Sequence, residues 1–272
     1  MENNREKLKV ESWINEQISF GKYGFSRETL EGAFPVRSQS ALKHSLSRLS
    51  RKGKIVSVHH DYYVIVSPEY ASRGILSPAL FVDGLMKNLN RPYYAGLLNA
   101  AAFYGAAHQS PQEFFVFTNF PAMRPARKKD VRINYISKAK IPENLLEDRK
   151  TETGYLKISS AELTAADVVQ FHRRIGGLNR AAAVLEELAE AINIEKINRE
   201  FIGETQTSVI QRLGYLLETV VGLEEVPEKL YRCAQDLQIK FFPVPLNAAG
   251  KIRGFSAVNR WKVIVNAEVE LD

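Results

Sequence analysis

Residues 32–60 contain six cations and no acidic side chain, and no other feature of the sequence restricts the chain's fold and function as strongly. The cations are Arg37, Lys43, Arg48, Arg51, Lys52 and Lys54. Apolar residues recur inside this run at helical spacing, which predicts a helix that begins near Ser38 or Ser40 and runs to Lys52. The residues expected on its buried face are Leu42, Leu46 and Leu49. The opposite face then carries only positive and neutral side chains, so it suits an anionic partner.

The segments on either side complete an element order that is typical of DNA-binding modules. Helical periodicity predicts a first helix over Arg5–Ile18, and a serine N-cap introduces a second helix over Arg27–Ala33. Two β-rich runs after the third helix, Ile55–Val58 and Tyr62–Val66, flank a polar turn and predict a hairpin. Three helices followed by a hairpin are the order of a winged helix-turn-helix domain, which we expect over residues 1–70. In that architecture the third helix enters the major groove, and the hairpin contacts the DNA backbone or minor groove.

The outward face of the third helix and the hairpin supply the candidate contacts to DNA. Side chains near the helix start are expected to read base edges, and they are Ser40, Lys43, His44 and Ser47. Side chains expected to hold phosphates, or to lie at the hairpin tip, are Arg48, Arg51, Lys54 and His60. Two other interpretations stay open: a basic helix face that is only solvated, and a winged helix that docks a protein. His59 and His60 lack further ligands at metal-binding spacing, so we expect a polar hairpin tip there.

Proline, serine and glycine residues predict a linker between Ser67 and Pro78, followed by a larger mixed α/β domain over residues 71–272. The expected fold class is therefore α+β. Helices are expected at about Pro78–Asn88, Tyr93–Gly105, Asn179–Ile192, Thr207–Val221 and Pro227–Leu237. A capping box of Thr164 and Asp167 is expected to open one more helix, which ends at Gly176. Strands are expected at Phe114–Thr118, Val131–Ile136, Leu156–Ser159, Ile239–Val244 and Trp261–Val265.

A second group of cations lies on the turn between the first two of these strands. This second basic cluster consists of Arg124, Arg127, Lys128 and Lys129. Arg132 follows just beyond it, and Asp130 is the one acidic residue among them. We include the cluster among the candidate DNA-binding residues. The alternatives are a surface for an acidic protein and a solvated strand end.

The composition excludes several classes of protein. The single cysteine, Cys233, cannot form an internal disulfide or a cysteine-rich zinc site. Lysine and arginine number 37 against 31 acidic residues, and this modest excess permits an anionic partner. Charged sequence directly after Met1 predicts no signal peptide, and the most apolar stretch, Tyr93–Ala107, is shorter than the roughly 20 residues of a membrane-spanning helix. We therefore expect a cytoplasmic protein.

The sequence motifs of catalysis are missing. The chain has no phosphate-binding loop ending in Lys-Ser/Thr, no dinucleotide fingerprint, no His-Glu-x-x-His and no Gly-x-Ser-x-Gly. We expect no enzymatic activity, no cofactor and no metal. Asp130, Asp148 and Lys150 superficially resemble a metal-dependent nuclease centre. Asp148 and Lys150, however, lie in a polar run and not on an apolar strand that would fix carboxylates around a cation.

Several segments in a fixed order resemble the AbiEi family of antitoxins, from bacterial systems usually classed as type IV toxin-antitoxin pairs. The N-terminal part that resembles the family ends in Arg51-Lys52-Gly53-Lys54-Ile55. The other segments are YYAGLLNAAAFYGAAHQSPQEFFVFT at 93–118, LTAADVV at 163–169, RLGYLLE at 212–218 and RWKVIVN at 260–266. One departure concerns the hairpin tip, where family members often have glycine before the paired aromatic residues and this chain has Asp61.

The resemblance implies a repressor of its own operon whose C-terminal domain counteracts a co-encoded nucleotidyltransferase-like toxin, AbiEii. It implies two partners, double-stranded operator DNA and that toxin, and it implies DNA contact by the third helix and the hairpin. One alternative is a winged-helix regulator whose C-terminal domain senses a ligand. Another alternative, from a different class, is a nuclease or DNA-modifying enzyme that a winged helix targets to DNA.

Overall fold

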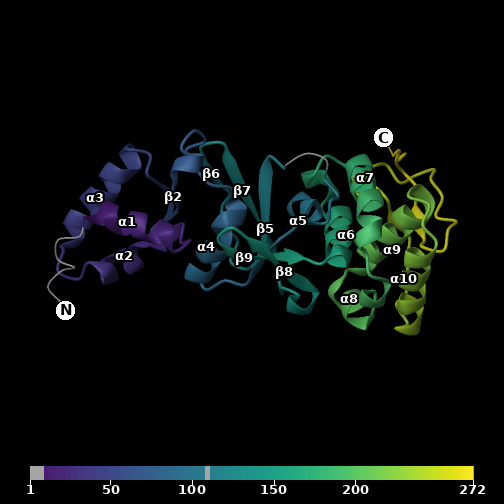
Figure 1. Ribbon diagram of the computed structural model, residues 1–272. Coiled ribbons are helices and arrows are strands. Elements are labelled where there is room, and N and C mark those ends of the chain that lie inside the picture. The colour runs from purple at the N-terminus through teal and green to yellow at the C-terminus, as the bar shows by residue number, and fades with distance from the viewer. Residues whose placement is uncertain (1–8, 108–110, 272) are drawn as a thin grey trace. The chain divides into compact units, whose positions relative to one another are not determined.

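The computed structural model describes residues 9–107 and 111–271 and has a mixed α+β fold (Figure 1). The chain divides into two compact units. The first unit contains Met1–Tyr94, Gln112–Ile141 and Asp148–Lys157, and the second contains Ala95–Pro111, Pro142–Glu147 and Ile158–Asp272. No helix in the described part of the chain is long and apolar enough to cross a membrane.

The first unit begins with three helices and a small antiparallel sheet. The helices are α1 (Val10–Ser19), α2 (Arg27–Ala33) and α3 (Gln39–Arg51), and the strands are β1 (Gly24–Ser26), β2 (Ile55–His59) and β3 (Tyr62–Ile65). The strand order is β1-β3-β2, so β2 forms one edge of the sheet. All three predicted helices and the hairpin are confirmed, whereas β1 was not predicted. Arg5 and Leu8, expected in the first helix, lie outside the described residues.

A single apolar cluster joins these elements and fixes how α3 is oriented. The predicted inner face of α3 is buried, as are apolar side chains from α1, α2 and both hairpin strands. The buried members are Val10, Ile14, Phe25, Leu30, Phe34, Leu42, Leu46, Leu49, Ile55 and Ile65. Because the helix buries this stripe, the side chains on its other face are left to solvent.

The rest of the first unit is built on a six-stranded sheet and one short helix. The strands are β4 (Tyr93–Ala95), β5 (Glu113–Asn119), β6 (Ala126–Lys128), β7 (Val131–Lys138), β8 (Leu146–Thr151) and β9 (Gly154–Ser159), in the order β6-β7-β5-β4-β9-β8. β5 runs parallel to β7, and β6 pairs antiparallel with β7, so β6 is an edge strand. The helix α4 (Val82–Asn88) follows a 3₁₀ turn at Pro78–Leu80. The predicted strands at 114–118, 131–136 and 156–159 are confirmed.

The tyrosine pair before the Ala-rich segment forms a strand, so the helix predicted over Tyr93–Gly105 is wrong in its first third. Tyr93–Ala95 is the buried strand β4, and α5 covers only Leu98–Phe103. The chain turns between them at Leu97, where φ is 55° and ψ is −136°. The Arg91-Pro92 start and the many alanines suggested a continuous helix, but a strand that is buried on both faces also has a continuous apolar sequence.

Tyr62 of the hairpin packs tightly against α4. A Cβ atom added to Gly84 of α4 would lie 2.6 Å from the Tyr62 hydroxyl oxygen, and one added to Gly24 of β1 would overlap the same atom. Burial raises the pKa of the Tyr62 hydroxyl, and the charge of Asp83 raises it further. Ile75 and Leu76, inside the segment expected to be a linker, are also buried. The small sheet of the N-terminal part, through Tyr62 and β1, is therefore held against α4 within the first unit.

The second unit is mainly helical. It contains α5, α6 (Ala161–Gln170), α7 (Leu178–Leu188), α8 (Arg199–Glu204), α9 (Thr207–Tyr215) and α10 (Glu225–Asp236), with a π-helical turn at Leu216–Val220. Both α7 and α9 pack against α6, and α10 packs against α9 (Figure 1). Two short parallel strands, β10 (Val244–Pro245) and β11 (Val263–Ile264), complete it. The helices expected from 179, 207 and 227 are confirmed within a few residues, α8 was not predicted, and the last two strands are much shorter than expected.

The predicted capping box at Thr164 and Asp167 is wrong. Ser160 is the N-cap of α6, because its side-chain oxygen accepts a hydrogen bond from the Leu163 N–H at 3.3 Å. Thr164 lies one turn inside the helix, and its hydroxyl is 2.7 Å from that of Ser159. Both Thr164 and Asp167 are buried inside the helix that they were expected to open. The helix also ends at Gln170, before the expected glycines.

Candidate nucleic-acid interface

The third helix presents the predicted outward face to solvent. Ser38 caps α3 by accepting a hydrogen bond from the Ala41 N–H at 3.2 Å, which leaves the side chains of the first turn free to project. The predicted readers and phosphate contacts on the helix are all exposed: Ser40, Lys43, His44, Ser47, Arg48 and Arg51. Within the described part of the chain, none of the three cations among them has a carboxylate within 4 Å.

An acidic residue from α1 partly compensates the charge at the far end of this helix. Glu11 forms an ion pair with Lys54, and this contact holds the pKa of the Glu11 carboxyl below its ordinary value. The charges of Lys52 and Arg48 lower the same pKa further. Counting charges along residues 32–60 missed Glu11, because the fold and not the sequence brings it there. Lys54 is therefore less free to meet an anion than Arg48 or Arg51.

The hairpin tip is polar and shaped by local contacts. The Ser57 hydroxyl donates to the His59 carbonyl at 3.1 Å, where the β2–β3 register shifts. Asp61 adopts φ 55°, a left-handed conformation that glycine adopts without steric cost, and this accounts for the residue type that family members often have there. His60 is exposed, and its Nδ1 lies 3.2 Å from an Asp61 carboxylate oxygen.

The second basic cluster lies on an edge strand and not on a plain turn. Arg127 and Lys128 belong to β6, and Lys129 turns the chain into β7 with φ 54°. Arg124, Arg127, Lys128 and Lys129 are all exposed. Arg132, by contrast, forms an ion pair with Glu113 at 2.7 Å, so its charge is already satisfied.

The structure brings the second basic cluster next to the hairpin, although about seventy residues separate them in sequence. Strand β6 lies beside β2, and a surface groove between them is lined by residues 57–60 and 122–128. Its cationic and histidine members are His59, His60, Arg124, Arg127 and Lys128, and among residues 9–107 and 111–271 no acidic side chain lines it. Two candidate groups that the sequence analysis treated separately are thus parts of one surface within the first unit.

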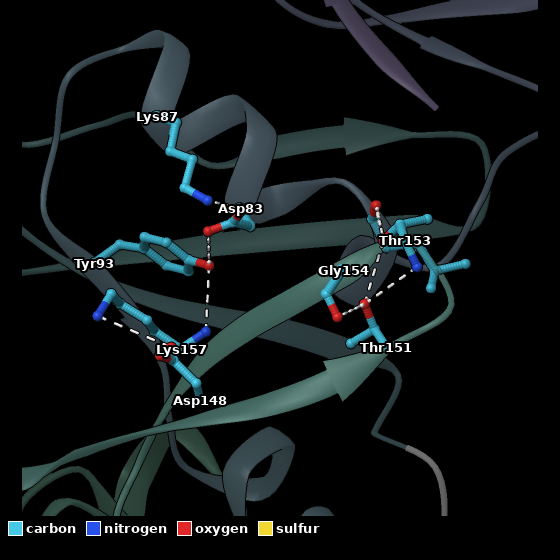
Figure 2. A network of polar contacts seen from close by, with 9 residues as sticks. Asp83, Lys87, Tyr93, Asp148, Thr151, Thr153, Gly154 and Lys157 are labelled. Carbon is cyan, nitrogen blue, oxygen red and sulfur yellow. Dashed lines mark hydrogen bonds and ion pairs between the residues drawn. The ribbon is translucent and has the colours of Figure 1, made fainter. Parts of the chain in front are cut away.

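A polar network joins α4 to the six-stranded sheet. Figure 2 shows Asp83 between Lys87 and Tyr93, with Lys157 of β9 beside the tyrosine. The Tyr93 hydroxyl donates to Asp83 at 3.0 Å and accepts from the Lys157 backbone N–H at 3.3 Å. Burial raises the pKa of Tyr93, and the charge of Asp83 raises it further, so the hydroxyl keeps its proton near neutral pH. The network ties α4 to the sheet.

The residues that suggested a nuclease do not form a metal centre. Asp148 lies on β8 and faces Lys157 across 3.9 Å, while Asp130 is exposed at the β6–β7 turn. In the residues that the structure describes, no three His, Cys, Asp or Glu side chains gather in a way that could hold a metal ion. His172 is buried, with Nδ1 3.0 Å from the Val169 carbonyl oxygen, and His108 lies outside the described residues.

Comparison with known proteins supports the resemblance found in the sequence. Residues 94–219 match the family model described as the AbiEi antitoxin C-terminal domain. The chain therefore carries an AbiEi antitoxin domain. The antitoxin class of toxin-antitoxin systems is thereby supported for this protein, and a cognate toxin is implied by the family.

A solved structure extends the likeness to nearly the whole chain. The crystal structure of the RV2827C protein from Mycobacterium tuberculosis is similar with a TM-score of 0.66 and 16% sequence identity. The match covers 94% of this chain and 90% of that one. At this identity the likeness shows the fold alone. No curated protein matched the chain.

Proposed function

We propose that this protein is an antitoxin that also represses its own operon, by binding operator DNA through an N-terminal winged helix. The AbiEi domain supports the antitoxin role. The observation that carries the DNA-binding role is the exposed face of α3, whose cations have no carboxylate partner in the described chain and whose inner face is fixed in the core. Cations that are exposed, unpaired and held on a rigid helix suit contact with phosphates at little cost in desolvation.

The arrangement of elements supports the winged-helix assignment over residues 1–70. Helices α1 to α3 precede the β2–β3 hairpin, which is the element order of that class, and β1 pairs with β3 as a third strand. In this proposal the first turns of α3 read base edges, with Ser40, Lys43, His44 and Ser47 as readers. Arg48, Arg51, Lys54 and His60 hold the phosphate backbone. Residues 71–272 would then form the antitoxin part.

The position of the second basic cluster favours DNA over a protein partner. Arg124, Arg127 and Lys128 line a groove together with the hairpin tip, so a duplex that touches His60 passes close to them. We assign Arg124, Arg127, Lys128 and Lys129 to nonspecific backbone contact, which positions a protein on DNA without reading its sequence. The alternative, a surface for the toxin, predicts that loss of these charges abolishes protection and leaves DNA binding intact.

The proposed toxin is a co-encoded nucleotidyltransferase-like protein, counteracted without enzymatic action by the antitoxin. The test combines growth rescue with DNA binding. Expressed together with the adjacent toxin gene, the full chain is expected to restore growth and to bind the DNA upstream of its own operon. The variant R48A/R51A of the full chain is expected to restore growth while binding that DNA more weakly. Rescue by residues 1–70 alone would contradict this assignment of roles.

The second basic cluster has its own test. The variant R127A/K128A/K129A is expected to lose affinity for operator and nonspecific DNA alike while still restoring growth, because its charges contact only the backbone. The matched control is K22A/K150A, which removes two exposed cations of the same unit away from the groove. Full DNA affinity combined with loss of growth rescue would mean that the second basic cluster serves the toxin and not DNA.

A further inference from the structure

A second groove of the first unit lies at the base of the hairpin and has about 760 Å³ of open volume. Its walls come from α1, from the end of α3 with the turn that follows, from β2 and β3, and from the β6–β7 turn. This volume falls within the range of roughly 300–1,000 Å³ that is usual for small-molecule sites. None of the features described above gives this groove a role.

Five cations surround the groove, and none of the described residues that line it is acidic. They are Arg51, Lys52, Lys54, Lys128 and Lys129. Lys54 is paired with Glu11, whereas the other four have no carboxylate within 4 Å among the residues that the structure describes. Like charges gathered around one hollow repel each other, and bound anions relieve that repulsion. The rim is therefore suited to a ligand with several negative charges.

The floor of the groove differs from its rim, because it is apolar with a few hydrogen-bonding groups. Ile18 of α1, Val56 of β2 and Val66 just after β3 are partly exposed there, whereas Ile14, Ile55 and Ile65 beneath them are buried in the core. The polar groups of the floor come from Asn15 and Ser57. An inorganic anion would use only the rim. A ligand with a flat, partly apolar ring and a chain of phosphates would use both surfaces.

Two glycines with positive φ shape the rim. Gly53 has φ 69° and turns the chain between the α3 and β2 segments, which places Lys52 and Lys54 on either side of it. Gly74 has φ 66°, and a Cβ atom there would lie 3.5 Å from Cε of Lys129. The aliphatic part of Lys129 thus lies over Gly74, which holds its ammonium group at the groove. Long cationic side chains that pack their stems in this way lose less freedom on binding.

We propose that this groove binds a free nucleotide with a polyphosphate chain. The phosphates contact Arg51, Lys52, Lys128 and Lys129, and the base lies on the partly exposed Ile18, Val56 and Val66. Arg51 and Lys128 also belong to the surface that we assign to DNA. Nucleotide and operator DNA therefore compete, and the nucleotide acts as an effector that weakens repression. The binding itself does not depend on the proposed function, but the competition does.

The first experiment measures binding to the full chain by calorimetry at about 150 mM salt, an ionic strength that screens loose surface attraction. The probes are ATP, GTP and inorganic tripolyphosphate. We expect one nucleotide per chain, and binding at least tenfold tighter for a nucleotide than for tripolyphosphate, roughly the effect of burying one ring. Equal affinity for tripolyphosphate and both nucleotides would overturn the proposal, because the floor would then contribute nothing. Failure of both nucleotides to bind at millimolar concentration would overturn it as well.

The second experiment tests the location. K128A/K129A is expected to weaken nucleotide binding by at least about tenfold, and the matched control K22A/K150A by less than about twofold. All four positions are exposed, so melting temperatures should stay close to that of the wild type. Unchanged nucleotide affinity in K128A/K129A would place any binding elsewhere and overturn the proposal. If only DNA affinity falls in K128A/K129A, the groove holds the DNA backbone instead.

The third experiment tests competition. Saturating nucleotide is expected to lower operator affinity of the wild-type chain by at least about tenfold and to leave K128A/K129A unaffected at the same concentration. Binding of nucleotide without any effect on DNA affinity would overturn the effector role, while the nucleotide site itself would stand. Failure of the chain to bind DNA at all would instead count against the proposed function, so the two failures are distinguishable.

Discussion

Two cationic regions of this protein use arginine in opposite ways. In the second unit, Arg260 has three partners within the fold. It pairs with Glu218 at 2.8 Å and with Glu228 at 2.6 Å, and its guanidinium lies 4.7 Å from the centre of the Tyr231 ring. On α3, Arg48 and Arg51 are exposed and have no carboxylate within 4 Å in the described chain. The comparison separates a cation that stabilises the fold from cations that are available to a partner.

The surroundings of each region explain the difference. Arg260 precedes Trp261, which is fully buried, packs against Tyr231 and Phe241, and donates its indole N–H to Glu218. Arg48 and Arg51 project from a helix whose packing depends only on its leucine face. Removing the first kind of arginine should therefore cost stability, and removing the second kind should cost binding. Substitutions in both regions test this contrast.

Trp261→Ala should give the largest loss of stability, roughly 3–5 kcal/mol, because it empties a large, fully buried site. Gly214 of α9 touches the same ring so closely that an added Cβ would overlap it, so the surroundings have little room to rearrange. Denaturant unfolding of the full chain measures the free energy change. A loss below about 1 kcal/mol would mean that the aromatic cluster does not anchor the second unit.

Leu46→Ala should destabilise the chain by roughly 2–5 kcal/mol, since this leucine is 4% exposed in the core beneath α3. Its exposed neighbour supplies the control: Ser47→Ala should change the free energy of unfolding by no more than about 0.5 kcal/mol. The pair compares the two faces of one helix. Equal effects of the two substitutions would show that α3 is not oriented as described.

Arg260→Ala should cost roughly 1–2 kcal/mol, because its charge-assisted hydrogen bonds to Glu218 and Glu228 are lost, although Trp261 and Arg232 still bind these partly exposed carboxylates. Arg48→Ala, the matched change on α3, should stay within about 0.5 kcal/mol. Arg260→Lys should restore only part of the loss, since a lysine cannot contact both carboxylates in a fixed plane. Denaturant unfolding curves of the three variants measure these changes in the free energy of unfolding. A larger loss for Arg48→Ala than for Arg260→Ala would reverse the comparison.

The smallest effect concerns the ion pair between Glu11 and Lys54. The pKa of Glu11 is lowered in the folded protein, so its contribution is present above the ordinary value of 4.5 and is lost as the pH falls through the folded pKa. Both side chains are partly exposed, so we expect a small shift in melting temperature that is detectable only in a direct comparison of variant and wild type. Melting temperatures of wild type and Glu11→Gln should therefore differ at pH 7 and converge at acidic pH. A constant difference across that range would mean that charge is not the cause.

The parts of the fold that the sequence predicted well are those with strong local signals. The leucine spacing of α3, the serine caps before α2 and α3, and the alternation in the hairpin each act within a few residues. The mixed α+β class and three strands of the central sheet, β5, β7 and β9, followed in the same way, whereas β4, β6 and β8 were missed. The leucine spacing also placed the candidate DNA-contacting side chains on the exposed face of α3.

The errors occur where a distant partner decides the conformation. Tyr93 and Tyr94 form a strand because they are buried within the sheet, and no local signal distinguishes this from a helix. Ser160, which directly follows β9, caps α6, and Thr164, the expected cap, lies inside the helix. Strand β6 and the position of Glu11 beside Lys54 likewise depend on contacts far apart in sequence.

A salt titration of DNA binding tests directly whether the cations of α3 contact DNA phosphates. Fluorescence anisotropy with the upstream DNA would be measured at several salt concentrations for the wild-type chain, R48A/R51A and the control K22A/K150A. If Arg48 and Arg51 each contact a phosphate, R48A/R51A should bind more weakly, and its slope of log affinity against log salt should be shallower by about two units, while the control matches the wild type. An R48A/R51A variant that folds normally and shows the wild-type affinity and slope would remove α3 from the DNA interface.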